Sequence, residues 1–415
     1  MPSISARRTR SAHTRLSRVT TMTTPTAPPA IPKKLPKRKD PYRQRGRIVL
    51  IVLVWLTAIA GALGSIVMSF GAGGVEGAWL SFLFALLPLP ILWAAYWWLD
   101  RYEPEPKRYK WAAFVWGAVV AVAIALAVEI FVQSTWGLSD ESMATYVAPL
   151  SEEPAKCLFL LLTFLRARRV IDGFVDGLVY AGIVGLGFAY VENIGYYAAS
   201  YLGSPEVDIY GAQGATTSFI VRGIASPFAH PLFTSAFGIA IGIAVGRKSK
   251  FAKFLLGTIG LAASIGLHGL WNGSLTYGGT EAFLTIYLIL GLTLFCLVVF
   301  AMVARFRQVQ TLRRSLTQIA DRGWIHPDEV PYLSKFGYRK AARRYAEANY
   351  GQNAEKMVKR YQRLATEVAF LHHAVMAQRT KPHGVERTYA LLDSMHALRP
   401  YLRFPPALQT TSHRR

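Results

Sequence analysis

Long apolar stretches recur through most of this 415-residue chain, and short polar connections separate them. A helix needs about 20 apolar residues to cross about 30 Å of hydrocarbon. Such stretches lie at roughly 47–70, 77–98, 111–133, 143–165, 173–199, 218–245, 251–275 and 281–304. The pattern predicts an all-α, polytopic membrane protein with about eight transmembrane helices, the first of them an uncleaved anchor.

The two ends of the chain have a different character. Residues 1–45 are basic and rich in Pro, Ser and Thr, with almost no apolar periodicity, which predicts a disordered tail. The membrane domain is predicted over residues 46–304. We expect residues 305–415 to form a helical cytoplasmic region that stabilises or regulates the protein. Its amphipathic face is formed by Met357, Tyr361, Leu364, Val368, Leu371 and Val375.

Charge is segregated along the chain, because 52% of residues are hydrophobic and 17% charged, yet the formal net charge is +23. Connections rich in Lys and Arg, near 101–110, 166–169 and 247–253, alternate with connections that contain neither. Cytoplasmic loops carry the excess of Lys and Arg, so we expect both termini in the cytoplasm. A basic cytoplasmic face also favours anionic lipids.

Two broad classes are disfavoured by composition. Cys157 and Cys296 both lie in apolar stretches, which excludes a disulfide framework and a CxxC metal pair. No basic motif is interleaved with aromatic residues, so we expect no nucleic acid as a partner.

Polar residues inside the predicted spans are costly and therefore indicate function. They are Glu152, Glu153, Lys156, Asp176, Glu192, Asn193, Arg222, His230, His268 and Asn272. With about 1.5 Å of rise per residue, the predicted topology puts Glu152, Glu192 and His268 roughly 10–15 Å below the outer surface. His230 lies slightly deeper, whereas Asp176 lies near the cytoplasmic end. Four antiparallel helices thus bring acids and histidines to one level.

The local spacings suit acid–base chemistry. In Glu-Glu-Pro-Ala-Lys, Lys156 follows Glu152 and Glu153 by one helical turn and partly neutralises them. Two adjacent carboxylates in a low-dielectric site do not readily both ionise, so the pair is suited to accept a proton from water. His268 and Asn272 are four residues apart and share a helix face, where both can donate hydrogen bonds to an oxyanion.

Four motifs on successive predicted helices then resemble a known family. They are Glu-Glu-Pro-Ala-Lys, Gly-Phe-Ala-Tyr-Val-Glu-Asn, His-Pro-Leu-Phe-Thr and His-Gly-Leu-Trp-Asn. In this order they resemble the PrsW family of bacterial intramembrane proteases, related to the CAAX prenyl proteases, over roughly residues 47–304. Two positions depart from the pattern of the CAAX prenyl proteases. Lys156 lies one residue before the position at which those proteases carry an arginine, and Glu192 lies where they carry a histidine.

The resemblance implies an enzyme of the bacterial cell membrane that cleaves a membrane-bound protein near the outer face. In PrsW-type systems that substrate is an anti-sigma factor. Glu152 or Glu153 would activate water with help from Glu192, while His268 and Asn272 would hold the oxyanion. His230 would complete the site. Lys156, Asn193 and Arg222 would support it, although an arginine near a helix end also snorkels by default.

Three alternatives stay open. A metalloprotease would bind zinc through His230, His268 and one of the acids Glu152, Glu153 or Glu192, although there is no His-Glu-x-x-His motif. A proton-coupled transporter would use the same buried groups, but the chain has no convincing internal repeat and its polar residues gather on one level. A non-catalytic membrane scaffold would keep these residues without turnover. The sequence favours the protease, by a mechanism that requires no metal.

Overall fold

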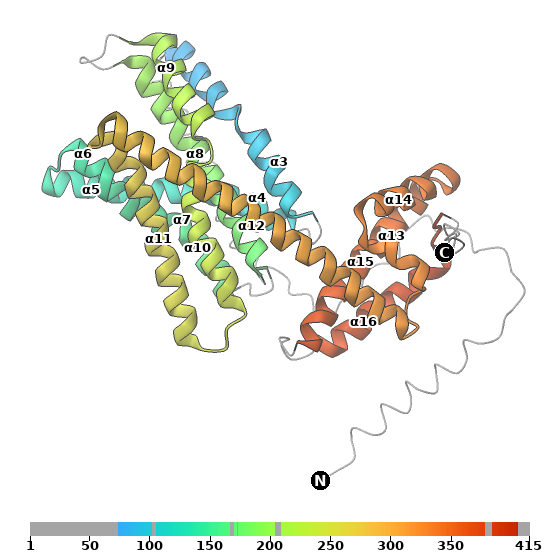
Figure 1. Cartoon of the computed structure of the whole chain (residues 1–415). Coiled ribbons are helices and arrows are strands. Elements are labelled where there is room, and N and C mark those ends of the chain that lie inside the picture. The colour runs from blue at the N-terminus through green and yellow to red at the C-terminus, as the bar shows by residue number, and fades with distance from the viewer. Residues whose placement is uncertain are drawn as a thin grey trace, which may run out of the picture. The chain divides into compact units, whose positions relative to one another are not determined.

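The computed structural model is helical, and no strand occurs among the residues it describes (Figure 1). The described residues are 74–101, 105–166, 170–171, 173–203, 209–377 and 384–405. The predicted all-α fold is therefore confirmed. The disordered tail predicted over 1–45 and the first predicted span, 47–70, lie outside the described residues.

Long apolar helices confirm that this is a multi-pass membrane protein. In the described part of the chain, 6 helices are long and apolar enough to cross a membrane. They are Gly74–Leu99, Lys107–Trp136, Phe174–Leu202, Gly211–Val245, Lys250–Thr276 and Gly279–Asp321. Each coincides closely with one of the predicted spans, whereas the total of eight and the orientation stay predictions.

The predicted span 143–165 is helical but more charged than the others. It forms α6 (Asp140–Ser142), the π-helical turn η2 (Met143–Val147) and α7 (Ala148–Arg166). Two glutamates and a lysine lie in the middle of α7, so length and composition do not mark it as a span. Its interior position is clear instead from its packing against α5, α8, α10 and α11.

The remaining elements of the membrane unit follow in chain order. Residues 74–86 are helical. The later elements are α3 (Leu89–Leu99), α4 (Lys107–Val115), η1 (Trp116–Ala121), α5 (Val122–Trp136), α8 (Phe174–Leu202), α9 (Gly211–Phe219), η3 (Ile220–Ala225), α10 (Ala229–Val245), α11 (Lys250–Thr276) and α12 (Gly279–Asp321). The turns η1 and η3 are π-helical, a local widening that often occurs near functional sites.

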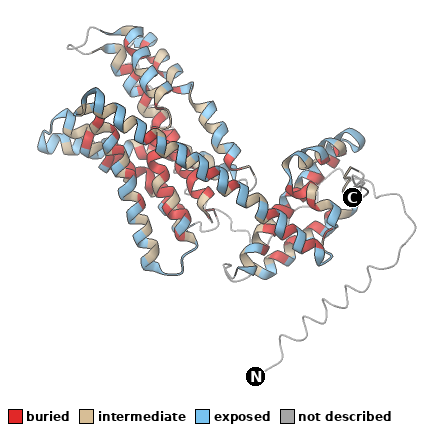
Figure 2. Cartoon of the chain, in the orientation of Figure 1, coloured by how far each residue is buried: buried red, intermediate tan, exposed pale blue. Residues whose placement is uncertain are grey.

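Helix α8 is the centre of the membrane unit. It packs against α3, α4, η1, α7, α9 and α10, and most of its length is buried (Figure 2). The peripheral helices instead expose large apolar side chains, such as Leu288 of α12 and Phe254 of α11. Exposed apolar surface of this kind suits contact with lipid, because lipid tails need no polar partner.

Glycines let other helices approach α8 closely. A Cβ at Gly187 would lie 2.1 Å from the Phe114 carbonyl oxygen, and one at Gly185 would lie 2.7 Å from the His230 carbonyl oxygen. At the crossing of α8 and α10, a Cβ at Gly238 would lie 2.3 Å from the carbonyl oxygen of Gly177. Small residues at such crossings allow backbone-to-backbone packing in membrane proteins.

A second compact unit begins at Leu312. After the end of α12 it comprises η4 (Pro327–Glu329), α13 (Val330–Ser334), α14 (Phe336–Tyr350), α15 (Gln352–Met376), α16 (Gly384–Leu398) and η5 (Arg399–Tyr401). Helix α15 packs against α13, α14 and α16. Met357, Tyr361, Leu364 and Val368 are buried in it, so the predicted amphipathic helix is confirmed.

The close crossing of α8 and α10 yields a prediction. In Gly238→Ala the new methyl group overlaps the Gly177 carbonyl, so the helices must separate, at a cost of about 1–3 kcal/mol. Gly266→Ala is the matched control, because its new methyl group would have no atom outside its own helix within 4 Å. We expect Gly238→Ala to lower the midpoint of thermal unfolding in detergent and Gly266→Ala to leave it unchanged or raise it. Equal midpoints for the two variants would contradict this packing.

Candidate active site

One turn of α7 carries two buried carboxylates and a buried amine. Glu152, Glu153 and Lys156 expose 5%, 0% and 0% of their surface. Lys156 Nζ donates to Glu152 Oε2 at 3.0 Å and to Glu153 Oε1 at 2.7 Å. The spacings of three and four residues put all three side chains on one helix face, as the sequence predicts. Pro154 lies inside the helix without ending it.

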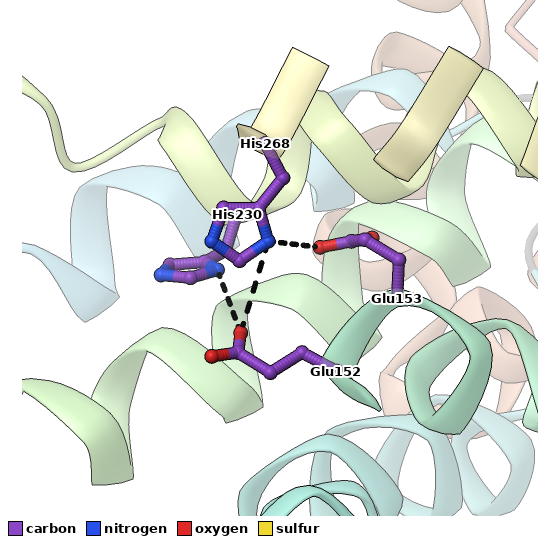
Figure 3. Close-up of side chains that lie close together, drawn as sticks. All are labelled: Glu152, Glu153, His230 and His268. Carbon is purple, nitrogen blue, oxygen red and sulfur yellow. Dashed lines mark hydrogen bonds and ion pairs between the residues drawn. The ribbon is translucent and has the colours of Figure 1, made fainter. Parts of the chain in front are cut away.

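Two histidines reach this turn from neighbouring helices (Figure 3). His230 of α10 places Nδ1 3.0 Å from Lys156 Nζ, and His268 of α11 places Nδ1 3.1 Å from Glu153 Oε1. The two rings are 5.2 Å apart and nearly perpendicular. His268 also stacks on Phe233, which fixes the plane of its ring. Side chains separated by up to 115 positions in the sequence thus meet at one place.

Helix α8 adds a carboxylate on the other side of His230. Glu192 Oε2 lies 2.6 Å from His230 Nε2 and 2.6 Å from Arg222 Nη2. Arg222 Nε donates to Asn193 Oδ1 at 2.7 Å, and the guanidinium covers the ring of Tyr196. Arg222 is therefore tied to the acid–histidine cluster by an ion pair. A carboxylate on one ring nitrogen of a histidine orients the other nitrogen.

Asn272 is bonded within the cluster as well. Its Nδ2 donates to the carbonyl oxygen of Ala144 at 2.8 Å and lies 3.3 Å from His268 Nε2. His268 can satisfy both neighbours by donating through Nδ1 to Glu153 and accepting through Nε2 from Asn272. In this arrangement the amide donors predicted to hold an oxyanion are already engaged.

Four polar side chains near the site were not among the sequence-predicted residues. Thr234 Oγ1 donates to Glu153 Oε2 at 3.1 Å, and Ser264 Oγ lies 3.2 Å from the same oxygen. Ser151 Oγ donates to Glu129 Oε1 at 2.7 Å. Glu129 gave a usable signal, because it is an acid inside the predicted span 111–133. The hydroxyl residues did not, since Ser and Thr are common in membrane helices.

Asp176 lies outside the cluster, in agreement with its predicted place at the other end of the membrane. It is in the first turn of α8, where its Oδ2 accepts a hydrogen bond from the Gly173 N–H at 3.0 Å. An acid at this position satisfies a free N–H group at the helix start and favours the helix dipole. Its role is therefore structural.

A small cavity adjoins His230. Its volume is about 20 Å³, and Asn193, Arg222, Ser226, His230 and Trp271 are among its lining residues. About 10–15 Å³ of this kind of space is enough for one water molecule when polar partners surround it. The cavity can therefore hold a water beside the histidine.

The four residues Glu152, Glu153, His230 and His268 could also be considered as metal ligands. One ligand atom from each lies within 4.8 Å of the others. Two imidazoles and two carboxylates are a donor set that zinc accepts. However, the Lys156 ammonium is hydrogen-bonded to three of these four side chains. As arranged here the donors surround a lysine nitrogen and do not fit an additional divalent cation.

The fold and the site define a class: a polytopic membrane protein whose acids and histidines cluster inside its helical bundle. Residues 105–304 match the family model described as PrsW family intramembrane metalloprotease. The resemblance inferred from the four motifs is confirmed. Residues 105–304 are thus similar to the PrsW family of intramembrane proteases.

Two curated relatives support the assignment. The Protease PrsW of Clostridioides difficile (strain 630) is 28% identical over 197 residues, which cover 46% of this chain and 77% of that protein. The Protease PrsW of Geobacillus kaustophilus (strain HTA426) is 30% identical over 153 residues, covering 37% of this chain and 59% of that protein. No solved structure matches the chain.

The ion pair between Glu192 and Arg222 yields a second prediction. Glu192→Gln leaves the largely buried Arg222 without its counter-ion, so we expect a loss of about 2–4 kcal/mol in unfolding free energy. The double variant Glu192→Gln/Arg222→Gln should lose less than the sum of the two single variants, because neither charge is then left unpaired. Unfolding in detergent followed by circular dichroism measures this cycle. Glu281→Gln, at an exposed position, is the control and should stay within about 0.5 kcal/mol of the parent. Additive losses would show that the pair is not coupled.

Proposed function

We propose that this chain is an intramembrane endopeptidase that hydrolyses a peptide bond of a membrane-anchored protein by glutamate-activated water. The observation that carries the proposal is the contact of Glu152, Glu153, His230 and His268 inside the membrane unit. These residues come from α7, α10 and α11, within the segment that matches the protease family. Buried acids beside imidazoles supply the groups that acid–base hydrolysis requires.

The hydrogen bonds favour Glu152 over Glu153 as the base. Glu153 has neighbours at both oxygens: Lys156 and His268 at Oε1, and Thr234 and Ser264 at Oε2. Among the described residues, Glu152 accepts one hydrogen bond, from Lys156 to Oε2. Its Oε1 therefore retains lone pairs that can take a proton from water. We assign Glu153 to holding His268 in place.

In the same way, we assign Glu192 to holding His230 in place. The short contact of Glu192 Oε2 with His230 Nε2 favours the tautomer with a proton on Nε2, which turns the Nδ1 lone pair toward Glu152 and Lys156. Arg222 holds Glu192 in this orientation and is itself hydrogen-bonded to Asn193. The adjoining cavity supplies a place for water next to this histidine.

The proposed reaction has two proton transfers. Glu152 accepts a proton from water as the water oxygen bonds to the carbonyl carbon of the substrate. The protonated Glu152 then gives this proton to the amide nitrogen as the carbon–nitrogen bond breaks, and a carboxylic acid and an amine result. Asn272 would stabilise the intermediate oxyanion by exchanging its bond with the Ala144 carbonyl for the substrate oxygen. His268 orients that amide through its Nε2.

The predicted topology locates the cleaved bond near the outer face, with both termini of the enzyme in the cytoplasm of a bacterial cell. In PrsW-type systems the substrate is an anti-sigma factor, so a membrane-anchored anti-sigma factor is the first substrate to test. The basic connections would meet anionic lipids on the cytoplasmic side.

Cleavage of a tagged single-span protein in liposomes tests the proposal. We expect the parent chain to cleave it and Glu152→Gln to lower the rate by about 10²–10⁴-fold, because the amide cannot accept a proton from water. His268→Ala should also lose activity, whereas the exposed control Glu281→Gln should retain it. Full activity of Glu152→Gln would refute the assignment of the base. Acid-driven solute uptake without cleavage would instead favour a proton-coupled transporter.

Metal removal gives a separate prediction for the same assay. Since the proposed steps use only side chains and water, we expect a zinc chelator to leave the cleavage rate unchanged. Loss of activity on chelation, with recovery on adding zinc, would require a metalloprotease mechanism in its place.

A further inference from the structure

Lys156 occupies an unusual position for a lysine. Its side chain is fully buried, and its Nζ contacts three of the four residues Glu152, Glu153, His230 and His268. The distances are 3.0 Å to Glu152 Oε2, 2.7 Å to Glu153 Oε1 and 3.0 Å to His230 Nδ1. A buried lysine usually needs a specific reason, because removing an ammonium from water is costly.

The dimensions of this cluster suit an ammonium. Hydrogen bonds between a charged nitrogen and a carboxylate are about 2.7–2.9 Å long, whereas zinc bonds to nitrogen and oxygen are about 2.0–2.2 Å long. The ligand atoms are correspondingly spread, with His268 Nδ1 and His230 Nδ1 each 3.9 Å from Glu152 Oε2. A tetrahedral zinc site with such bonds places its ligand atoms about 3.4 Å apart, so zinc would require Glu152 Oε2 to move closer to both histidines.

The bonding of the ammonium is also complete. An ammonium has three donors, and those of Lys156 meet Glu152, Glu153 and the Nδ1 of His230. The ring of Phe188 covers the nitrogen at 3.9 Å from its centroid, which adds a cation–π contact. No bond has to be broken or added for this nitrogen to stay in place.

We propose that the Lys156 ammonium is the resident cation of the Glu152–Glu153–His230–His268 cluster and excludes a divalent metal from it. The family description names a metalloprotease, whereas here the lysine supplies the positive charge of the cluster. It balances the adjacent carboxylates and positions Glu152 and His230. Two cations within one cluster would repel each other strongly in so buried a place. The inference deepens the proposed function, since it names the group that replaces a metal in that site.

Metal binding by the full chain in detergent tests the proposal independently of proteolysis. The variants are Lys156→Met, which keeps an unbranched apolar chain but removes the charged nitrogen, and Lys250→Met, an exposed control. Zn²⁺ affinity is measured by titration calorimetry, and coordination by the visible absorption of added Co²⁺. We expect the parent and Lys250→Met to bind less than one equivalent at this site. Lys156→Met should gain one equivalent, with affinity at least about tenfold higher, because the competing charge is gone.

Loss of this new binding in Lys156→Met/His268→Ala would assign the metal to the cluster and support the proposal. One equivalent of zinc in the parent chain, lost in Glu152→Gln, would overturn it, and so would a Lys156→Met protein that folds but gains no metal. If Lys156→Met does not fold, Lys156→Gln takes its place. Zinc binding by the parent chain also tests the proposal by itself.

The two proposals fail in different experiments. Tight zinc binding by a parent chain that cleaves its substrate would overturn the role of Lys156 and leave the protease intact. A parent chain that binds no zinc and cleaves nothing, with metal gained in Lys156→Met, would support the resident lysine and count against proteolysis.

Discussion

Two carboxylates that follow each other in a helix can be buried together only if positive charge or hydrogen-bond donors are buried with them, and Lys156 supplies that charge from the same turn of α7. Glu153 then needs further donors, at Oε1 beside Lys156 and at Oε2. His268, Thr234 and Ser264 lie against these oxygens, so α10 and α11 must approach α7 at this level. The active-site cluster and the packing of the central helices are thus one arrangement, held by the same buried charges.

Close packing around α8 makes this arrangement possible. Gly185 lies directly against the backbone of His230, where a Cβ would come within 2.7 Å of the carbonyl oxygen. Because α10 can approach so closely, His230 lies between Glu192 on one side and Lys156 on the other. Membrane helices gain little from hydrophobic burial against one another, so small residues and polar contacts decide where they meet. Small residues and polar contacts occur together where α8 and α10 cross.

The sequence allowed much of the site to be predicted. Helix rise and charge distribution put Glu152, Glu192, His230 and His268 at one level, and in the structure these side chains do lie within one hydrogen-bonded cluster. Asp176 was separated from them on the same grounds. Glu129 is not among the predicted site residues, although it too is an acid inside a predicted span. Thr234 and Ser264 carried no such signal, because hydroxyl side chains in membrane helices also bond to their own backbone.

By itself the sequence determined the class of fold, the apolar helices and the four motifs, because a bilayer constrains length, composition and charge along each segment. Only the tertiary structure decided how each helix is turned about its axis. That rotation determines that Glu153 is enclosed by donors, that Arg222 pairs with Glu192 and that Lys156 reaches His230. These contacts join residues 30 to 115 positions apart, and their geometry depends on packing between helices, which no local pattern records.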